Sequence, residues 1–252
     1  MKYCLSDAQP ISLLRKADEI KVAYKNINSV FELMDEMPDK TFILDIPEEE
    51  SFKFDIELCT AYAEKVNIVL CLYNAHAAKI AAAVGLKWYW GYPISSFYEL
   101  RGIIDLEPAY IFLTAPLSFD LNKVSQITTI PIRMCPNIAY DNYIPREEGI
   151  CGQWVRPEDQ DLYDEFVSVF EFRGNDLAHE ATLFKVYAED KKWPGNLNLL
   201  ITNLNFDIDN RIIDPDVIEV RLYCGQKCMT NSKCHLCPQM FKFSDKVRHA
   251  YY

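Results

Sequence analysis

The stretch from residue 67 to residue 92, NIVLCLYNAHAAKIAAAVGLKWYWGY, contains the pattern that decides the fold. Its first seven residues form an almost continuous apolar run, which is typical of a strand buried on both faces of a sheet. An alanine-rich segment follows from about Asn74 to Val84, and Gly85 stands where a helix commonly ends. Residues 86–92 form a second apolar run. This order predicts two parallel strands joined by a crossover helix.

The same alternation of apolar runs and helical segments continues along most of the chain. Strands are predicted at residues 19–24, 41–47, 67–73, 86–92, 109–115, 129–135 and 168–172, with 198–204 as a candidate eighth. Repeated strand and helix units predict a (β/α)8-like barrel, complete or distorted. An open, doubly wound parallel sheet is the alternative.

Polar residues mark the starts of several predicted helices. Ser29 and either Ser95 or Ser96 are suited to cap a helix, because a serine side chain can accept a hydrogen bond from a backbone N–H of the first turn. Pro157, followed by two acidic residues, also indicates a helix start, since proline and acidic side chains favour the first turn. The helix that follows 168–172 is expected to begin at Asp176.

Length and composition restrict the class of protein. The chain has 252 residues, half of them hydrophobic, which is enough for a sizeable core in one domain. It shows no apolar leader and no run near the roughly 18 apolar residues of a membrane span, so we expect a cytoplasmic protein without a membrane partner. With eight glycines and no G-x-S-x-G, phosphate-loop or H-E-x-x-H motif, dinucleotide-dependent hydride transfer and the familiar hydrolase sites are disfavoured.

Four of the nine cysteines lie within fourteen residues near the carboxyl end: Cys224, Cys228, Cys234 and Cys237. Their spacing, C-x3-C-x5-C-x2-C, forms two close pairs joined by a short loop, as in tetrahedral zinc sites. We expect a structural zinc ion; a 4Fe-4S cluster and four unliganded thiols are the alternatives. A closed four-cysteine site would fold a tail, residues 221–252, that packs on an α/β domain of residues 1–220.

This tail is basic, although the chain as a whole is acidic. From Arg221 onward six basic residues oppose one acidic residue, a local charge of +5 that leaves −16 for the rest, given the total of −11. With its net negative charge, the molecule as a whole should repel a phosphate backbone. Residues 221–248 could instead contact an acidic partner, nucleic acid or the acidic body of the protein itself.

Catalytic side chains of a (β/α)8 barrel collect at the carboxyl ends of its strands. We predict catalytic roles for Asp45, His76 and Glu171, because each ends or closely follows a predicted strand. A carboxylate placed there beside arginines can act as a general base. His76 also has an ordinary interpretation, as a surface residue at a helix start. Other polar residues at these ends are Tyr73, Asn74, Tyr92, Thr114, Arg133, Asn137 and Arg173.

The segment from residue 133 to residue 159 is long and irregular, as lids and binding loops usually are. The predicted substrate-binding residues here are Arg133, Asn137, Gln153, Trp154 and Arg156. Arginines can bind an anion through paired hydrogen bonds, tryptophan offers a stacking surface, and amides orient polar groups. The alternative is a structural plug of one barrel end, anchored by Trp154, in which Arg156 pairs with Glu158 or Asp159.

Short strand and helix units, a long cysteine-containing loop after a middle strand and a cysteine-rich region together resemble the collagenase-like peptidase family. Several of its members are better described as iron–sulfur-dependent hydroxylases of transfer or ribosomal RNA. The resemblance covers the order of elements over most of the chain and implies a barrel fold and RNA-related work. The family signature places two cysteines a few residues apart after a glycine. Cys135 and Cys151 are sixteen residues apart, so no catalytic residue is carried over.

The sequence therefore predicts a metal-binding α/β-barrel enzyme that acts on a polar or anionic small molecule, with a nucleic-acid component as one candidate. Arg133, Asn137, Arg156 and Glu171 form its predicted binding and acid/base site. The alternative is a non-catalytic binding or assembly protein that uses the basic cysteine-rich tail as its contact surface. The oligomeric state is not predicted.

Overall fold

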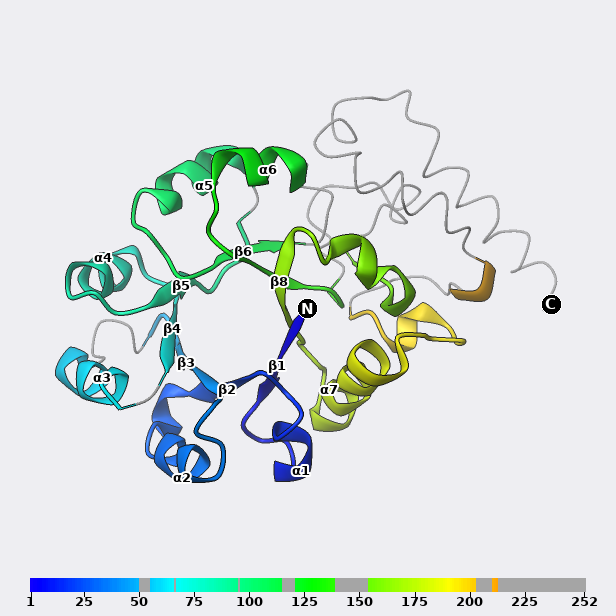
Figure 1. Ribbon diagram of the computed structural model, residues 1–252, viewed down its shortest axis with the longest axis horizontal. Coiled ribbons are helices and arrows are strands. Elements are labelled where there is room, and N and C mark those ends of the chain that lie inside the picture. The colour runs from blue at the N-terminus through cyan, green and yellow to red at the C-terminus, as the bar shows by residue number, and fades with distance from the viewer. Residues whose placement is uncertain are drawn as a thin grey trace. The chain divides into compact units, whose positions relative to one another are not determined.

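A computed structural model describes residues 1–49, 55–65, 67–94, 96–114, 121–138, 154–202 and 210–212. Its eight strands are β1 (Lys2–Ser6), β2 (Glu19–Ala23), β3 (Thr41–Ile46), β4 (Ile68–Leu72), β5 (Trp88–Trp90), β6 (Ile111–Thr114), β7 (Ile132–Cys135) and β8 (Val167–Glu171). They form one parallel sheet in the order β5-β4-β3-β2-β1-β8-β7-β6, nearly closed into a barrel (Figure 1). Isolated parallel bridges, such as Tyr89 with Tyr110, join its two edges. The predicted (β/α)8-like barrel is thereby confirmed.

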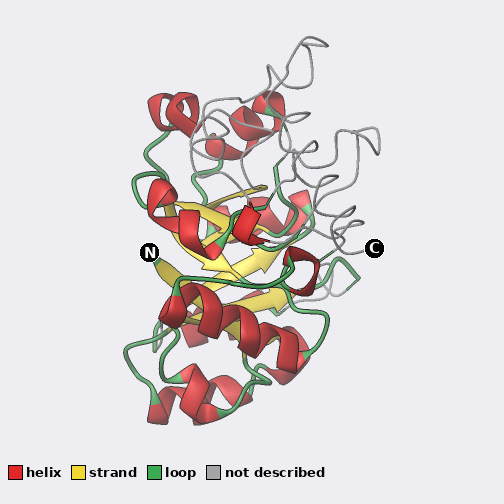
Figure 2. Ribbon diagram, turned by 90° about the vertical axis from the view of Figure 1, so that its right-hand side faces the viewer, coloured by secondary structure: helices red, strands yellow, loops and turns green. Residues whose placement is uncertain are grey.

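Helices alternate with these strands along the chain. They are α1 (Ile11–Leu14), α2 (Ser29–Glu36), α3 (Ile56–Ala63), α4 (Ala75–Ala83), α5 (Phe97–Ile104), α6 (Leu121–Ile127) and α7 (Leu177–Phe184), which continues as a π-helix (Lys185–Asp190). Short 3-10 helices occupy Tyr24–Asn26, Pro157–Tyr163, Leu197–Leu199 and Asn210–Ile212. Figure 2 shows the strands and helices in a second view, coloured by type.

Local sequence explains where the helices begin and end. Asn74, Ser96 and Asp176 cap α4, α5 and α7 by accepting hydrogen bonds from first-turn N–H groups. Gly85 follows α4 with φ 75°, a left-handed conformation that glycine adopts without steric cost. Pro157 does stand in the first turn of its helix, but that helix is 3-10. Ser29 is the first residue of α2 rather than its cap.

Two strand predictions at the chain ends need correction. The first strand is β1, KYCLS, which was not predicted because only Cys4 and Leu5 are buried and the segment lacks a longer apolar run. The candidate strand at 198–204 is wrong where the structure describes it, since Leu197–Leu199 form a 3-10 helix. Among the described residues, the strand pairing of Thr202 is an isolated bridge with Ile138. The eight strands of the barrel therefore begin with β1 at Lys2 and end with β8 at Glu171.

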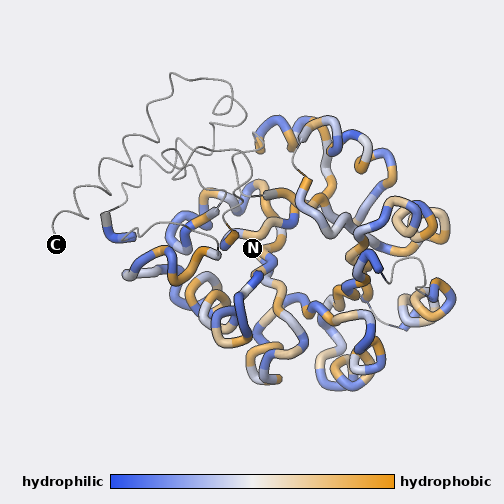
Figure 3. Tube along the Cα trace, turned by 180° about the vertical axis from the view of Figure 1, so that it is seen from behind, coloured by the Kyte–Doolittle hydropathy of each residue, from blue (hydrophilic) through white to orange (hydrophobic). Residues whose placement is uncertain are grey.

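Apolar residues fill the layer between strands and helices. Successive residues of a strand point to opposite faces, so Phe42, Leu44 and Ile46 of β3 share the face away from the lumen, and all three are buried. The outer helices alternate hydrophobic and hydrophilic positions, as Figure 3 shows by colour. The lumen differs, because charged side chains from several strands meet there.

Contacts divide the chain into two compact units. The first comprises Met1–Leu113, Thr128–Met134 and Val167–Glu171, and so contains almost the entire sheet with α1 to α5. The second comprises Thr114–Ile127, Cys135–Phe166 and Phe172–Tyr252. No helix among the described residues has the length and apolar character needed to cross a membrane.

Candidate functional site in the barrel lumen

A buried arginine occupies the centre of the lumen. Arg133 of β7 is 0% exposed, and its guanidinium binds Glu171 of β8, with Nη1 3.1 Å from Oε2. Its other terminal nitrogen binds Glu19 of β2. Both glutamates are almost fully buried as well. Barrel interiors are usually filled by branched apolar side chains, so an ion cluster at this position is a specific feature of this protein.

Two tyrosines enclose this arginine. The rings of Tyr89 and Tyr110 lie 4.7 and 4.8 Å from the guanidinium carbon, within the range of cation–π contacts. Their hydroxyls donate to the same glutamates, Tyr89 to Glu171 at 2.9 Å and Tyr110 to Glu19 at 2.8 Å. Burial raises the pKa of both phenols above the usual range, so they remain donors. The interactions fix the glutamates around Arg133.

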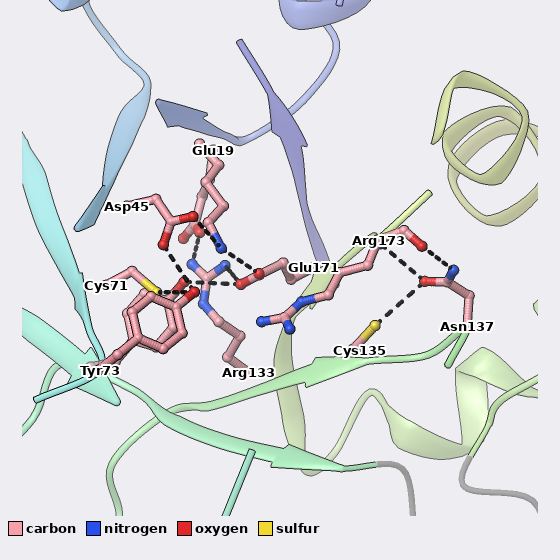
Figure 4. A network of polar contacts seen from close by, with 11 residues as sticks. Glu19, Asp45, Cys71, Tyr73, Arg133, Cys135, Asn137, Glu171 and Arg173 are labelled. Carbon is pink, nitrogen blue, oxygen red and sulfur yellow. Dashed lines mark hydrogen bonds and ion pairs between the residues drawn. The ribbon is translucent and has the colours of Figure 1, made fainter. Parts of the chain in front are cut away.

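The cluster continues from Glu171 toward the carboxyl ends of β2 and β3 (Figure 4). Lys21 lies two residues after Glu19 on the same face of β2, and its Nζ is 3.0 Å from Glu171 Oε1 and 3.4 Å from Asp45 Oδ2. Tyr73 donates its hydroxyl to Asp45 Oδ1 at 3.0 Å. Side-chain exposure rises along this path, from 2% for Glu171 to 18% for Lys21 and 29% for Asp45. Asp45 and Lys21 are thus the members that solvent reaches.

Protonation states follow from burial and from neighbouring charges. Burial by itself lowers the pKa of Lys21, but Cys71, Glu171 and Asp45 raise it well above its usual range in total. Lys21 is therefore an ammonium at neutral pH. Burial raises the pKa of Cys71 to about 11 and that of Tyr73 above its usual range, so both keep their protons. An ammonium and a phenol therefore contact the Asp45 carboxyl group, and the Cys71 thiol lies 3.5 Å from the oxygen of that phenol.

The raised pKa of Lys21 also has a consequence for stability. A lysine whose pKa is higher in the folded than in the unfolded protein stabilises the fold fully below the unfolded value of about 10.4. That contribution is lost as the pH rises through the folded-state pKa. We expect the difference in stability between the wild type and Lys21→Met to be constant below about pH 10.4 and to shrink as the pH rises beyond it, as measured by urea unfolding at a series of pH values.

We call Glu19, Lys21, Asp45, Arg133 and Glu171 the lumen cluster. Three of the predicted site residues, Asp45, Arg133 and Glu171, belong to it, and Lys21 joins them. The prediction overlooked Lys21, although its spacing of two from Glu19 in an apolar strand placed both charges on one face. With three carboxylates and two cations, the cluster has a formal charge of −1. Fully ionised, it carries no excess positive charge for a multiply charged anion.

His76, the other predicted catalytic residue, lies in the first turn of α4. It is exposed, and its backbone N–H donates to Asn74 Oδ1 at 2.8 Å as part of the helix cap. No contact of the imidazole with the lumen cluster is found among the described residues. The surface interpretation fits this position; a catalytic role for His76 stays a prediction.

In the second unit, Asn137 ties two chain segments together. Its Nδ2 donates to the Arg173 carbonyl at 2.8 Å, and its Oδ1 accepts from the Arg173 N–H at 3.2 Å. Cys135 places its thiol 3.4 Å from the same Oδ1. Figure 4 shows these groups at the ends of β7 and β8. The Asn137 amide thus orients the backbone in this structure, and its predicted role in binding a substrate stays a prediction.

Arg156 forms the ion pair that the structural alternative anticipated. Its Nη2 donates to Asp159 Oδ1 at 2.7 Å, and its Nε binds the other carboxylate oxygen. Both side chains are buried, and Trp154 beside them in sequence is buried too. Gln153 lies outside the described residues. Substrate binding by Gln153, Trp154 and Arg156 stays a prediction.

The metal prediction concerns residues outside the described part of the chain. Cys224, Cys228, Cys234 and Cys237 all lie there. Within the described ranges no group of three His, Cys, Asp or Glu side chains could hold a metal ion. The described cysteines are buried and form no disulfides with one another, as expected for core thiols.

Close packing beside the cluster gives a test by substitution. A Cβ atom on Gly91 would lie 2.5 Å from Tyr73 Cζ and 2.9 Å from Cys71 Sγ, so the tyrosine that holds Asp45 would have to move. We expect Gly91→Ala to lower the free energy of unfolding by about 1–3 kcal/mol in urea titrations. Gly102→Ala in α5 is the control, since no atom lies within 4 Å of its Cβ position. Equal stability of the two variants would contradict the packing.

Function has to be inferred from the geometry and charge of the lumen cluster, because no protein-family model and no curated protein matches the chain.

Proposed function

We propose that this protein is a (β/α)8-barrel enzyme that acts on a small polar or anionic molecule, such as a nucleic-acid component, at the carboxyl ends of β2 and β3. The observation that carries the proposal is Lys21, an ammonium held between Glu171 and Asp45 while still partly open to solvent. Barrel enzymes place their catalytic groups at this end of the strands. Burying charge without use is costly, which favours a function for these groups.

The two partly exposed groups have complementary chemical capacities. Asp45 can exchange a proton with a substrate, because each of its oxygens accepts only one interaction among the described residues. Lys21 keeps its proton and can stabilise negative charge that develops on a substrate oxygen. A carboxylate beside a fixed cation is the arrangement that general acid/base catalysis needs.

Glu171 supports this site from a buried position. It is 2% exposed and engages Arg133, Tyr89 and Lys21 at once. These contacts leave it little access to a substrate. In this proposal Glu171 is a positioning residue that holds the Lys21 ammonium, and Arg133 in turn holds Glu171.

Comparison of two carboxylate variants tests the proposal. A panel of small metabolites is screened for compounds that raise the melting temperature of the wild-type protein, and each stabilising compound is then assayed for turnover. Asp45→Asn should retain the fold and lose turnover by about 10²–10⁴-fold, the usual contribution of a general acid or base. Asp39→Asn is the matched control, because that carboxylate is 78% exposed and its Lys40 partner is 3.9 Å away. Turnover that survives in Asp45→Asn would refute the assignment.

The cysteine-rich tail is the second part of the proposal, and it rests on sequence spacing. We expect protein purified without oxygen to carry zinc bound by Cys224, Cys228, Cys234 and Cys237, and to be colourless. Elemental analysis with an absorption spectrum measures this directly. Iron and a brown colour would indicate the 4Fe-4S alternative. A protein that contains neither zinc nor iron would refute the site.

A further inference from the structure

The two solvent-accessible members of the lumen cluster leave defined hydrogen-bonding positions open. An ammonium has three N–H donors, and the partners of Lys21 among the described residues are Glu171 and Asp45. Counted over these described partners, one donor remains for a ligand oxygen. Asp45 retains acceptor capacity on both oxygens, next to that donor. A ligand that satisfies both groups must present an oxygen acceptor beside a hydrogen that can be removed.

Charge narrows the class of ligand further. With the formal charge of −1 in the lumen cluster, a multiply charged anion would meet net repulsion at Lys21. A neutral carbonyl compound avoids this repulsion and still accepts a hydrogen bond from the ammonium. When its carbonyl carbon is joined to a carbon that bears hydrogen, acceptor and removable proton lie on neighbouring atoms, matching the adjacent Lys21 and Asp45.

We propose, building on the enzyme function above, that this site takes small neutral α-hydroxycarbonyl compounds and catalyses reversible proton transfer at the carbon beside the carbonyl. Asp45 is the base and Lys21 the group that stabilises the oxygen. The remaining members of the lumen cluster and the tyrosines hold these two in place. Nothing in this step requires a metal or an oxidant.

The step conserves atoms and electrons. The Asp45 carboxylate forms an O–H bond to the proton as the C–H bond breaks. The C–H electron pair becomes the new carbon–carbon double bond, and the carbonyl π pair moves to the oxygen, where the Lys21 ammonium stabilises the negative charge. Return of the proton from Asp45 to the same carbon regenerates the carboxylate and gives exchange. Return to the neighbouring carbon gives isomerisation, in which the hydroxyl proton of the intermediate moves to the oxygen beside Lys21 and the other oxygen becomes the new carbonyl.

Neighbouring groups are unsuited to the base role. Cys71 and Tyr73 keep their protons at neutral pH, because burial raises the pKa of each. Glu19 and Glu171 are almost fully buried against Arg133. Asp45 alone among the carboxylates of the lumen cluster is more than a quarter exposed, at 29%. Tyr73 orients it through the 3.0 Å hydrogen bond to Oδ1.

Deuterium exchange tests this reaction with simple probe compounds and does not require the natural substrate. The full-length protein is incubated in D2O with dihydroxyacetone, glyceraldehyde or hydroxyacetone, and proton NMR follows loss of the hydrogens beside the carbonyl. The wild type should exchange at least about 10²-fold faster than Asp45→Asn, and Asp39→Asn should match the wild type. Lys21→Gln should also lose exchange. Lys21→Arg keeps the positive charge, and its circular dichroism spectrum and residual exchange show whether the loss of exchange in Lys21→Gln reflects unfolding.

Two failures can be told apart. If the wild type exchanges none of the three compounds faster than buffer does, the substrate class and the reaction are overturned. If another metabolite is nevertheless turned over in an Asp45-dependent manner, the proposed enzyme function stands without this reaction. If no compound of either set depends on Asp45, both proposals fail.

Discussion

Arg133→Met should lower the free energy of unfolding by about 3–5 kcal/mol, because it leaves two buried carboxylates without their shared cation. Arg133 is 0% exposed, and Glu19 and Glu171 lie on either side of it. The tyrosine rings would also lose their cation–π partner. For a chain of this length the melting temperature should fall by on the order of 10 °C, measured by calorimetry or circular dichroism.

The loss should depend on pH. A buried carboxylate that has lost its cation costs less once acid neutralises it, so the stability deficit of Arg133→Met should shrink as the medium becomes more acidic and widen toward neutral pH. Arg15→Met is the control, because its pair with Glu36 is exposed and such pairs contribute about 1 kcal/mol or less. The buried cluster would be contradicted if Arg133→Met and Arg15→Met lost similar free energies of unfolding. It would also be contradicted if the loss in Arg133→Met did not change with pH.

Arg156→Met should destabilise the protein by a similar amount, about 3–5 kcal/mol, for the same reason in the second unit. The partner left behind is Asp159, which is buried and bound through both carboxylate oxygens. Replacing that partner as well, in Arg156→Met/Asp159→Asn, should recover part of the loss because no unpaired charge remains. Urea unfolding of the wild type, Arg156→Met, Asp159→Asn and the double variant measures the coupling free energy between the two side chains.

This cycle also decides between the two interpretations of residues 133–159. If Arg156 is a structural residue, its loss lowers stability while the affinity of folded protein for its ligands remains unchanged. Arg101→Met, an exposed arginine of α5, controls for removal of positive charge. A stable Arg156→Met variant with weakened ligand binding would instead support the binding role.

The barrel could be predicted because its strands are nearly continuous apolar runs between amphipathic helices. The run at 67–73 and the alanine-rich helix after it correspond to β4 and α4 almost residue for residue. The strand count failed at the ends, where β1 buries few residues and the apolar run near 198 folds as a 3-10 turn. Hydrophobicity reports burial, and short segments of either type can be equally buried.

The site was only partly predictable. Asp45, Arg133 and Glu171 could be named because strand ends are the usual place for catalytic side chains. Their pairing could not, since it depends on which residues of non-adjacent strands meet across the lumen. Lys21 escaped notice because a single lysine in a strand usually indicates a solvent-facing position. Arg156 is a second limit, since the sequence alone could not decide between ligand binding and the buried pair with Asp159 that the structure shows.

The most direct test of the proposed site observes Lys21 itself. In protein labelled with ¹³C and ¹⁵N in lysine, the Cε–Nζ correlation of Lys21 can be assigned from its absence in Lys21→Met. Adding the compound that the wild type converts fastest should shift this signal. The signal of Lys87, whose Nζ donates a hydrogen bond to Asn67 Oδ1, should not move. A compound that is turned over while the Lys21 signal stays unchanged would contradict catalysis in the lumen.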